Sequence, residues 1–466
     1  MSTVASPRRA ADVPKFVTGS ILRHILVMTG AGAIGLMAIF AGDLANIYFL
    51  SLAGDEAIVA AVGYASSILF ISTSIGIGLS IAATALVAPA LGAGLRVRAR
   101  RLSAHAHVLT FAISVALSIV LWFAIEPFLA LLGARGRTLE LAEHYLAILL
   151  PALPMLALGI TSSAVLRSVG DARRAMNVTL YGAIANLALD VIFILQLGWG
   201  LEGAAWASVL ARAVMMAIGL YGVIGVHKLM GRPKLATFRL DAPAFAAIAV
   251  PAVLTNIATP VGNAYVTAAI ANFGDSAVAG WAVIGRIIPV AFGAIYALSG
   301  SIGPILGQNL GARQPDRMHR TFTLSLLVMC AFTLAAWLGL ALFADNFANA
   351  FKADGTARHL IVVFCRWLSP LFVFLGALFI ANAAFNTLGR AHYSAFLNWG
   401  RATVGTIPFV MAGAAYGGAE GVLAGNMIGG IVFGVAAVWM GYQLIDKTSD
   451  KLRGGVPNRV DLASST

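Results

Sequence analysis

The sequence has little charge and almost no cysteine. Only 11% of its 466 residues are Asp, Glu, Lys or Arg, whereas 60% are hydrophobic, and the two cysteines are Cys330 and Cys365. A soluble domain of this length needs far more charge to cover its surface. Both cysteines lie in apolar stretches, so we expect them to pack as small side chains and not to form a disulfide or a metal pair. The composition indicates an integral membrane protein.

Signatures of catalysis are also missing. The eight histidines form no His-x-x-Glu-His or similar metal pattern, and the chain has no Gly-x-x-x-x-Gly-Lys-[Ser/Thr] phosphate loop. We therefore expect neither an enzyme nor direct ATP hydrolysis, and no cofactor. No cleavable signal peptide is expected either, because residues 1–20 form a polar tail and the first apolar stretch is too long for one.

Long apolar stretches fill the chain instead. A bilayer core about 30 Å thick needs about 20 apolar residues per helix, and the stretches lack the alternating polarity of β-barrel strands. The predicted fold class is all-α integral membrane, with twelve transmembrane helices. We place them at 24–50, 57–90, 104–132, 141–166, 176–197, 203–227, 244–272, 277–308, 320–344, 358–386, 394–415 and 421–445.

Basic residues gather on one side of the predicted spans. The net charge is +12, and most Lys and Arg lie in the two tails and in every second loop, whereas the opposite loops hold few. This distribution follows the positive-inside rule and places both termini in the cytoplasm. We predict a multi-pass protein of the inner (cytoplasmic) membrane that contacts lipids, and no nucleic-acid partner.

The two halves of the chain repeat each other. Matching landmarks are separated by 215 to 220 residues: Pro89 and Pro304 in Pro-x-Leu-Gly motifs, Gly42-Asp43 and Gly262-Asn263, Gly170 and Gly389, and Gly203 and Gly421. Six spans per half is an even number, so both halves enter the membrane from the same side. The repeat predicts two pseudo-symmetric six-helix lobes around a central cavity.

The predicted domains follow from this repeat. They are a cytoplasmic N-terminal tail (1–23), an N-lobe (24–227), a cytoplasmic linker (228–243), a C-lobe (244–445) and a cytoplasmic C-terminal tail (446–466).

Two aspartates, Asp43 and Asp190, lie deep inside apolar stretches, whereas the other acidic residues lie in loops, tails or span ends. A carboxylate at bilayer depth is costly, and it persists mainly where it faces a wet cavity and binds a cation or a proton. Both aspartates lie about 10 Å below the predicted outer surface at 1.5 Å per residue. Asn186, one turn from Asp190, and Ser208 in the next span lie near the same depth.

This set of oxygens suits a proton or a sodium ion. Burial and a neighbouring carboxylate favour protonation, and a sodium ion would take side-chain oxygens in place of water. The alternative is that each aspartate only hydrogen-bonds a neighbouring helix, with Arg212 as a candidate partner. In the second half, Asn263 takes the place of Asp43 and Phe409 that of Asp190, so the acidic pair belongs to the first half.

Four arginines also lie within predicted spans: Arg212, Arg286, Arg366 and Arg401. We favour ion pairing, carbonyl capping or a position at a span end for them, and the alternative is that they line the cavity. The candidate substrate-cavity residues are Arg212, Asn256, Asn263 and Arg286.

Over residues 20–445 the chain resembles the multidrug and toxic compound extrusion (MATE) family. The resemblance rests on Asp43, the two Pro-x-Leu-Gly motifs, Asn-x-x-x-Asp at 186–190 and Gly-x-Gly-x-x-Gly-Ala-Ala at 198–205. Within this family, the chain is similar to the branch named after DNA-damage-inducible protein F. That resemblance implies that Asp43, Asn186 and Asp190 handle the coupling cation, with Ser208 where threonine is usual and Na⁺ as one candidate ion. Span 1 lacks the proline at which this branch often bends.

The function predicted from these features is a monomeric secondary exporter. It would exchange H⁺ or Na⁺ for an organic solute or drug by alternating access. One alternative is a flippase for lipid-linked precursors from the same superfamily, and another is a membrane enzyme or a passive channel. The sequence names no substrate.

Overall fold

A computed structural model describes residues 14–51 and 56–454, and the regular elements over these residues are all helical. We call the helices α1 to α8 the N-lobe and α9 to α17 the C-lobe. The N-lobe helices are α1 (Ile21–Ser51), α2 (Glu56–Gly92), α3 (Arg96–Phe123), α4 (Ile125–Leu131), α5 (Gly136–Leu149), α6 (Leu153–Val169), α7 (Ala172–Asp190) and α8 (Gly200–Leu220). The C-lobe helices are α9 (Leu235–Ala271), α10 (Asp275–Ala291), α11 (Gly293–Gly311), α12 (Pro315–Leu342), α13 (Ala344–Ala350), α14 (Gly355–Val363), α15 (Phe372–Thr387), α16 (Ala391–Ala402) and α17 (Ile407–Arg453).

Ten helical stretches of the described chain are long and apolar enough to cross a membrane, or eleven if α10 and α11, bent by 49°, form one span. The stretch Ala391–Arg453 holds 63 residues, about twice the length of the others. It is broken at Gly418, whose φ of 56° and ψ of −141° are not helical. A Cβ on Gly413 would lie 1.9 Å from the carbonyl oxygen of Gly421, so the chain doubles back there. This contact favours two crossings, and the total of twelve stays a prediction.

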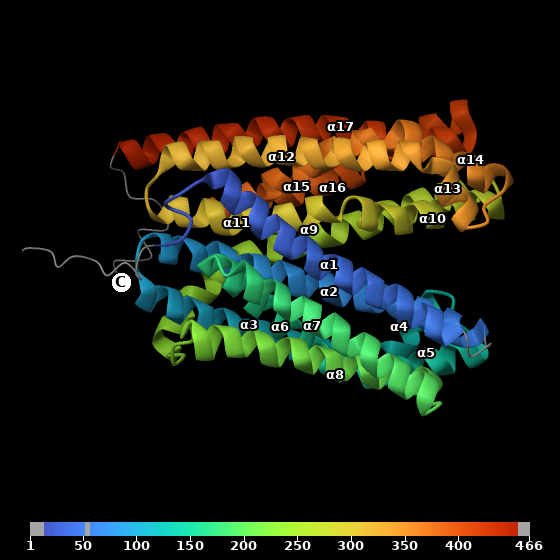
Figure 1. Cartoon of the computed structure of the whole chain (residues 1–466), viewed down its shortest axis with the longest axis horizontal. Coiled ribbons are helices and arrows are strands. Elements are labelled where there is room, and N and C mark those ends of the chain that lie inside the picture. The colour runs from blue at the N-terminus through green and yellow to red at the C-terminus, as the bar shows by residue number, and fades with distance from the viewer. Residues whose placement is uncertain (1–13, 52–55, 455–466) are drawn as a thin grey trace, which may run out of the picture.

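The two lobes lie side by side and draw apart toward one end (Figure 1). We call the end where α1 begins and α17 finishes the inner end, and the opposite end the outer end. The inner ends of α2 and α11 meet, whereas the helices of the two lobes diverge toward α4 and α13 (Figure 1). Helix α1 runs diagonally between the lobes and packs on α7 and on α11. The central cavity expected between the lobes stays a prediction.

The structure repeats element by element. Four C-lobe elements begin 219 residues after their N-lobe counterparts: α13 after α4 (344 and 125), the 3₁₀ turn Ser369–Leu371 after Leu150–Ala152, α15 after α6 (372 and 153), and α16 after α7 (391 and 172). The order of buried and exposed side chains over 41–50 also recurs position for position over 261–270. Asp43 and Asn263 therefore occupy equivalent positions in their lobes.

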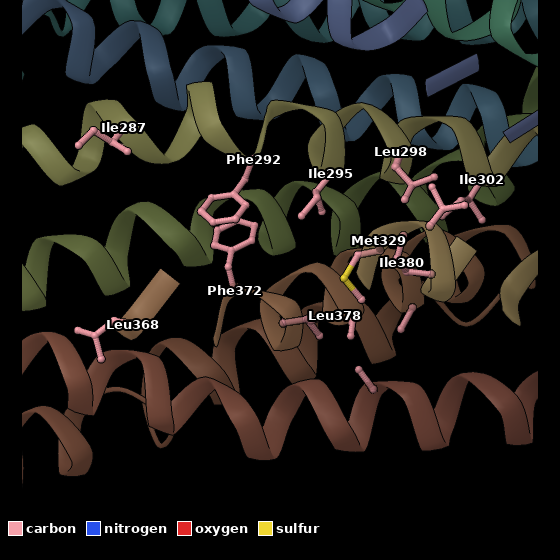
Figure 2. Close-up of a cluster of buried hydrophobic side chains, with 14 of the residues drawn as sticks. Ile287, Phe292, Ile295, Leu298, Ile302, Met329, Leu368, Phe372, Leu378 and Ile380 are labelled. Carbon is pink, nitrogen blue, oxygen red and sulfur yellow. The ribbon is translucent and has the colours of Figure 1, made fainter. Parts of the chain in front are cut away.

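The C-lobe core forms around helix breaks (Figure 2). Phe292 lies between α10 and α11, and Phe372 begins α15 just after Pro370. Their rings stack with centroids 4.0 Å apart and planes 8° from parallel, and both side chains are fully buried. Such aromatic pairs add stabilisation beyond the area they bury. The stack therefore fixes the two broken spans against each other.

Three predicted domain boundaries fall inside observed helices, beginning with the boundary between residues 23 and 24, since α1 starts at Ile21. Residues 235–243 of the predicted linker are already the first turns of α9, and α17 continues eight residues past the predicted span end at 445 to Arg453. Hydropathy marks where a chain enters the bilayer, and a helix need not end at that surface. Of the two predicted tails, residues 1–13 and 455–466 lie outside the described residues.

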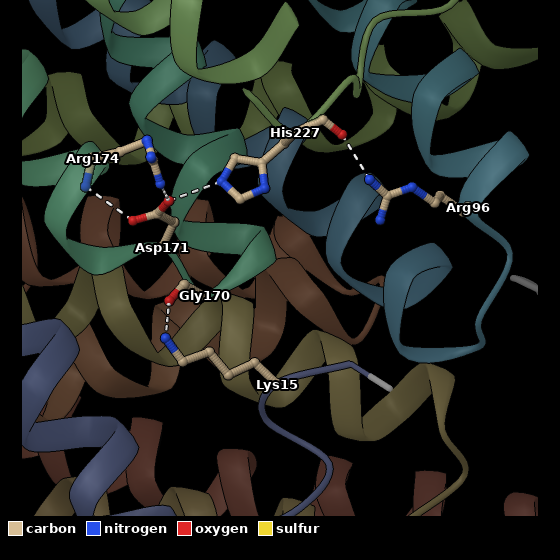
Figure 3. A network of polar contacts seen from close by, with 6 residues as sticks. All are labelled: Lys15, Arg96, Gly170, Asp171, Arg174 and His227. Atoms are coloured by element: carbon tan, nitrogen blue, oxygen red, sulfur yellow. Dashed lines mark hydrogen bonds and ion pairs between the residues drawn. The ribbon is translucent and has the colours of Figure 1, made fainter. Parts of the chain in front are cut away.

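A polar network ties the loops of the inner end together (Figure 3). Asp171 caps α7 by accepting a hydrogen bond from the Arg174 backbone N–H. Its Oδ2 also accepts hydrogen bonds from Arg174 Nη1 at 2.6 Å and from His227 Nε2 at 2.8 Å. Burial alone would raise the pKa of the Asp171 carboxyl, but these hydrogen bonds outweigh burial and lower it below its ordinary 3.8. The network therefore stabilises the ionised form.

We expect Asp171→Ala to destabilise the fold by about 1–3 kcal/mol, because it removes a helix cap and a partly buried acceptor. Since the folded-state pKa is depressed, this stabilisation is present above about pH 4 and is lost as pH falls through the lower folded value. Thermal unfolding of the purified protein at several pH values measures it. Asp316→Ala is the control, because Asp316 pairs with Arg453 while 87% of its side chain is exposed. A pH-independent deficit in Asp171→Ala would contradict the expectation.

Candidate functional site

The candidate site is centred on Asp190, the last residue of α7. Its side chain is fully buried. Asp190 Oδ1 accepts a hydrogen bond from Asn46 Nδ2 of α1 at 3.1 Å, and Oδ2 accepts one from Asn186 Nδ2 at 2.7 Å. Within the described residues, these two amides are the hydrogen-bond partners of the carboxylate, and no basic side chain hydrogen-bonds it. Asp190 thus bridges two helices of the N-lobe.

The backbone changes form at Asp190. The α-helical pattern ends there, and a π-helical segment, Val191–Gln196, continues the span to its outer end. A π-helical turn inside a helix is rare and is frequent at functional sites. The i,i+4 spacing keeps Asn186 on the same face as Asp190, so both side chains face α1.

A second ring of polar groups surrounds this bridge. Asp43 lies one turn before Asn46 on α1, with an exposed side chain, and interacts electrostatically with both Asp190 and Arg212. The hydroxyl of Tyr145, whose side chain is buried, hydrogen-bonds Ser208 of α8. Two acids, one guanidinium and two hydroxyls therefore lie close together in the N-lobe.

Arg212 also caps a broken helix. In the 3₁₀ turn after α5, the Leu153 N–H donates to the carbonyl of Leu150. In a continuous α-helix it would donate to the carbonyl of Leu149, so the Leu149 oxygen is left without this bond. Arg212 Nη1 donates to that Leu149 oxygen at 3.0 Å. Ser118 Oγ donates to the Leu150 oxygen at 2.6 Å. The carbonyl capping expected for the intramembrane arginines is confirmed for Arg212, which faces Asp43 as well.

The structure brings most of the predicted coupling residues together. Asn186 contacts Asp190 directly, Asp43 lies within electrostatic range, and Ser208 turns toward Tyr145 instead of the carboxylates. Asn46 and Tyr145 were not predicted from the sequence. Asn46 had a readable signal, because it is a polar residue three positions after Asp43 within the same apolar stretch.

The candidate cavity residues of the C-lobe are less closely grouped. Asn263 is exposed, and Asn256 Nδ2 donates to the Ala252 carbonyl of its own helix at 2.8 Å. Arg286 is exposed and makes no hydrogen bond or ion pair within the described residues. Arg366 Nη2 pairs with Asp345 Oδ2 at 2.6 Å, which confirms the ion pairing expected for it. Arg401 Nη2 reaches Thr259 Oγ1 at 3.2 Å.

The side chains of this site are not arranged to hold a metal ion. Within the described ranges, no group of three or more His, Cys, Asp or Glu side chains could hold one. Around Asp190, the amides of Asn46 and Asn186 present their NH₂ groups to the carboxylate, so their own oxygens point away from it. A sodium ion would need both amides to turn.

A separate set of contacts closes the inner end between the lobes. Gln308 of α11 donates from Nε2 to the Ser168 carbonyl at 2.6 Å and accepts from the Phe16 N–H at 2.8 Å. Arg317 Nη2 donates to the Phe16 carbonyl at 2.7 Å, and the Phe16 side chain is buried. Lys15 Nζ bonds the Gly170 carbonyl (Figure 3). The segment before α1 thus joins both lobes.

A second contact between the lobes lies nearby. Asp241 of α9 pairs with Arg101 Nε at 3.1 Å and His105 Nδ1 at 2.7 Å, both on α3. The inner end is therefore held by the segment before α1 and by this ion-pair cluster.

Two homologous helical lobes with polar side chains at bilayer depth define the class of this protein: a multi-pass membrane transporter, not an enzyme. The sequence model of the MatE family matches residues 31–192 and again residues 251–411, so one model fits each lobe. The chain belongs to this MATE family.

Known proteins agree with this assignment. The FAD transporter of Shewanella oneidensis is 30% identical over 436 residues, which cover 92% of this chain and 96% of that protein. The multidrug export protein MepA of Staphylococcus saprophyticus is 22% identical and covers 94% of this chain and 97% of its own. The crystal structure of a mutant of the Vibrio cholerae MATE transporter VcmN superposes with a TM-score of 0.86 at 26% identity, over 91% of this chain and 96% of that one.

Proposed function

We propose that this protein is a cation-coupled antiporter that exports an organic solute across the inner membrane, as a monomer with its inner end in the cytoplasm. The observation that carries the proposal is Asp190, a fully buried carboxylate bonded to two neutral amides. A buried charge without a counter-ion in contact is costly. A site of this kind gains stability by taking up a positive charge.

The geometry favours a proton over sodium as that charge. Both oxygens of Asp190 already accept amide N–H groups, so a proton neutralises the carboxylate with the least rearrangement. The charge on Asp43 also repels that on Asp190. A sodium ion would need amide oxygens that now point away from the carboxylate.

Helix α1 supplies the mechanical link between cation and substrate. It carries Asp43 and Asn46 near its outer end, and it follows directly on the segment with Phe16 that closes the inner end. Protonation of Asp190 weakens the charge-assisted bond from Asn46 and frees α1 to move against α7. Cation binding and opening of the inner end are thereby coupled through one helix without direct contact between cation and solute.

The relatives offer a hint about the solute. The Shewanella oneidensis relative is named an FAD transporter, and others are named multidrug export proteins. Since the identity to the first extends over nearly the whole chain, flavin nucleotides are the first solutes to test.

Transport in proteoliposomes tests the proposal. We expect a pH gradient, acidic on the outer side, to drive FAD export, and a sodium gradient at clamped pH to have little effect, because the site needs only a proton to become neutral. Riboflavin and a cationic dye serve as comparison solutes. Transport driven by sodium alone would show that the amides turn to form a sodium site. Transport that responds to neither gradient would refute cation coupling.

The alternative of a lipid-linked precursor flippase rests on Arg286, an exposed arginine without a partner among the described residues. A pyrophosphate headgroup could pair with it. Restoration of cell-wall or polysaccharide synthesis in a depleted strain would favour the flippase, whereas export of FAD would favour the antiporter.

A further inference from the structure

Arg401 is a buried cation in the C-lobe with few partners. Helix α16 begins at Ala391, so at 1.5 Å per residue Arg401 lies about 15 Å along it, near the middle of a bilayer core of about 30 Å. The residue is only 7% exposed, and its Nε makes no hydrogen bond. A guanidinium can donate five hydrogen bonds. In the described part of the chain, the Arg401 side chain donates one, to Thr259 Oγ1 of α9 at 3.2 Å.

The groups around Arg401 are hydroxyls and not acids. It interacts electrostatically with Tyr296 of α11, and Thr259 belongs to a polar face of α9 that also carries Asn256 and Asn263. No carboxylate within the described chain pairs with it. Arg366, by contrast, is paired with Asp345, and Arg212 bonds a free carbonyl and faces Asp43.

The scaffold itself does not require this arginine. Helices α7 and α16 are equivalent elements that begin 219 residues apart, and the same offset places Gly182 of the N-lobe at the position of Arg401. Arg401 also lies in the last turn of α16, where a cation is favoured by the helix dipole. That attraction is available to an exposed side chain and gives no reason to bury the guanidinium between α9 and α11.

We propose that Arg401, with the hydroxyls of Thr259 and Tyr296, forms an anion-binding site that takes a phosphate group of the exported solute. The proposal deepens the proposed export function and rests on it. A guanidinium binds phosphate through paired N–H groups, and hydroxyls complete such a site. The protein then divides its charges: the N-lobe acids take the coupling cation, and the C-lobe arginine takes the anionic solute.

Binding to the purified full-length protein tests this site without any ion gradient. FMN and riboflavin share one ring system and differ by a phosphate, and flavin fluorescence reports their binding. We expect Arg401→Gln to weaken FMN binding by about tenfold or more, as for loss of a charge-assisted contact, and to leave riboflavin binding unchanged. Arg401→Lys should retain part of the affinity. Arg366→Gln, which removes an arginine paired with Asp345, is the matched control and should bind FMN like the wild type.

Competitors identify the source of the phosphate. Displacement of FMN by inorganic pyrophosphate from the wild type but not from Arg401→Gln supports a soluble phosphate. Displacement by phosphatidic acid in mixed micelles, with pyrophosphate inactive, supports the same site with a lipid phosphate. Equal losses of FMN and riboflavin in Arg401→Gln, or a wild type that does not prefer FMN to riboflavin, would overturn the anion site. Cation coupling is tested separately, by the response of export to imposed gradients in proteoliposomes.

Discussion

Asp190→Asn is expected to lower gradient-driven export strongly and to leave the fold intact. Asparagine fills the same volume and bonds both Asn46 and Asn186 once one of these amides turns its oxygen toward it, but it cannot take up or release a proton. A coupling free energy of 1–3 kcal/mol corresponds to about a 5- to 150-fold change, so export under an imposed pH gradient should fall by about that factor. The measurement is the initial rate of FAD export from proteoliposomes, with and without the gradient.

Two comparisons make this expectation specific. Asp275→Asn makes the same change at an exposed carboxylate at the outer start of α10, and should export like the wild type. Solute exchange without a gradient should survive in Asp190→Asn, because the solute site does not include Asp190. If Asp190→Asn kept the full response to the pH gradient, the carboxylate would be only a structural bridge between α1 and α7.

Much of the architecture was predictable because it follows from hydropathy and repetition. The apolar stretches locate the helices, and the paired landmarks anticipate lobes whose elements recur 219 residues apart. The break in α17 also agrees with the sequence, since Gly418 falls between the predicted spans 394–415 and 421–445. The helical ends next to the predicted spans were not predictable, because Arg239, Asp241 and Pro243 interrupt the start of α9 and residues 446–453 are mostly polar or charged.

The candidate site was predictable only where its contacts are local in sequence. Asn186 and Asp190 meet because they lie four residues apart on one helix. The bond from Asn46 to Asp190 and the one from Tyr145 to Ser208 join different helices, and spacing along the chain does not fix which faces of two helices meet. The same limit hid the bond between Arg212 and the Leu149 carbonyl.

The second large effect is expected at the inner end, where the lobes touch through glycine. A Cβ added to Gly92 of α2 would lie 2.0 Å from the carbonyl oxygen of Gln308, and one added to Gly311 of α11 would lie 1.9 Å from that of Pro89. These are contacts with backbone atoms, which cannot turn aside as a side chain could. Each lobe therefore contributes a glycine that lets the two Pro-x-Leu-Gly segments approach closely.

We expect Gly92→Ala to push the lobes apart at the inner end. Overpacking of this kind costs about 1–3 kcal/mol, and only the closed inner end bears that cost, so the equilibrium should shift toward an open inner end by about 5- to 150-fold. Spin labels on Arg173→Cys and His319→Cys, both exposed at the inner end, in a background without Cys330 and Cys365, measure the separation. The label distance should lengthen, and gradient-driven export should fall.

Gly300→Ala is the matched control for this experiment. It makes the same change on α11, but the added Cβ would meet no atom within 4 Å. Its label distances and export should match those of the wild type. A Gly92→Ala protein with an unchanged distance distribution would mean that the contact between α2 and α11 yields locally, and that closure depends on the bonds of Gln308 to Phe16 and Ser168. Closure through the glycines predicts instead that Gly311→Ala shifts the distances in the same direction as Gly92→Ala, because the two added methyl groups press on opposite sides of one contact.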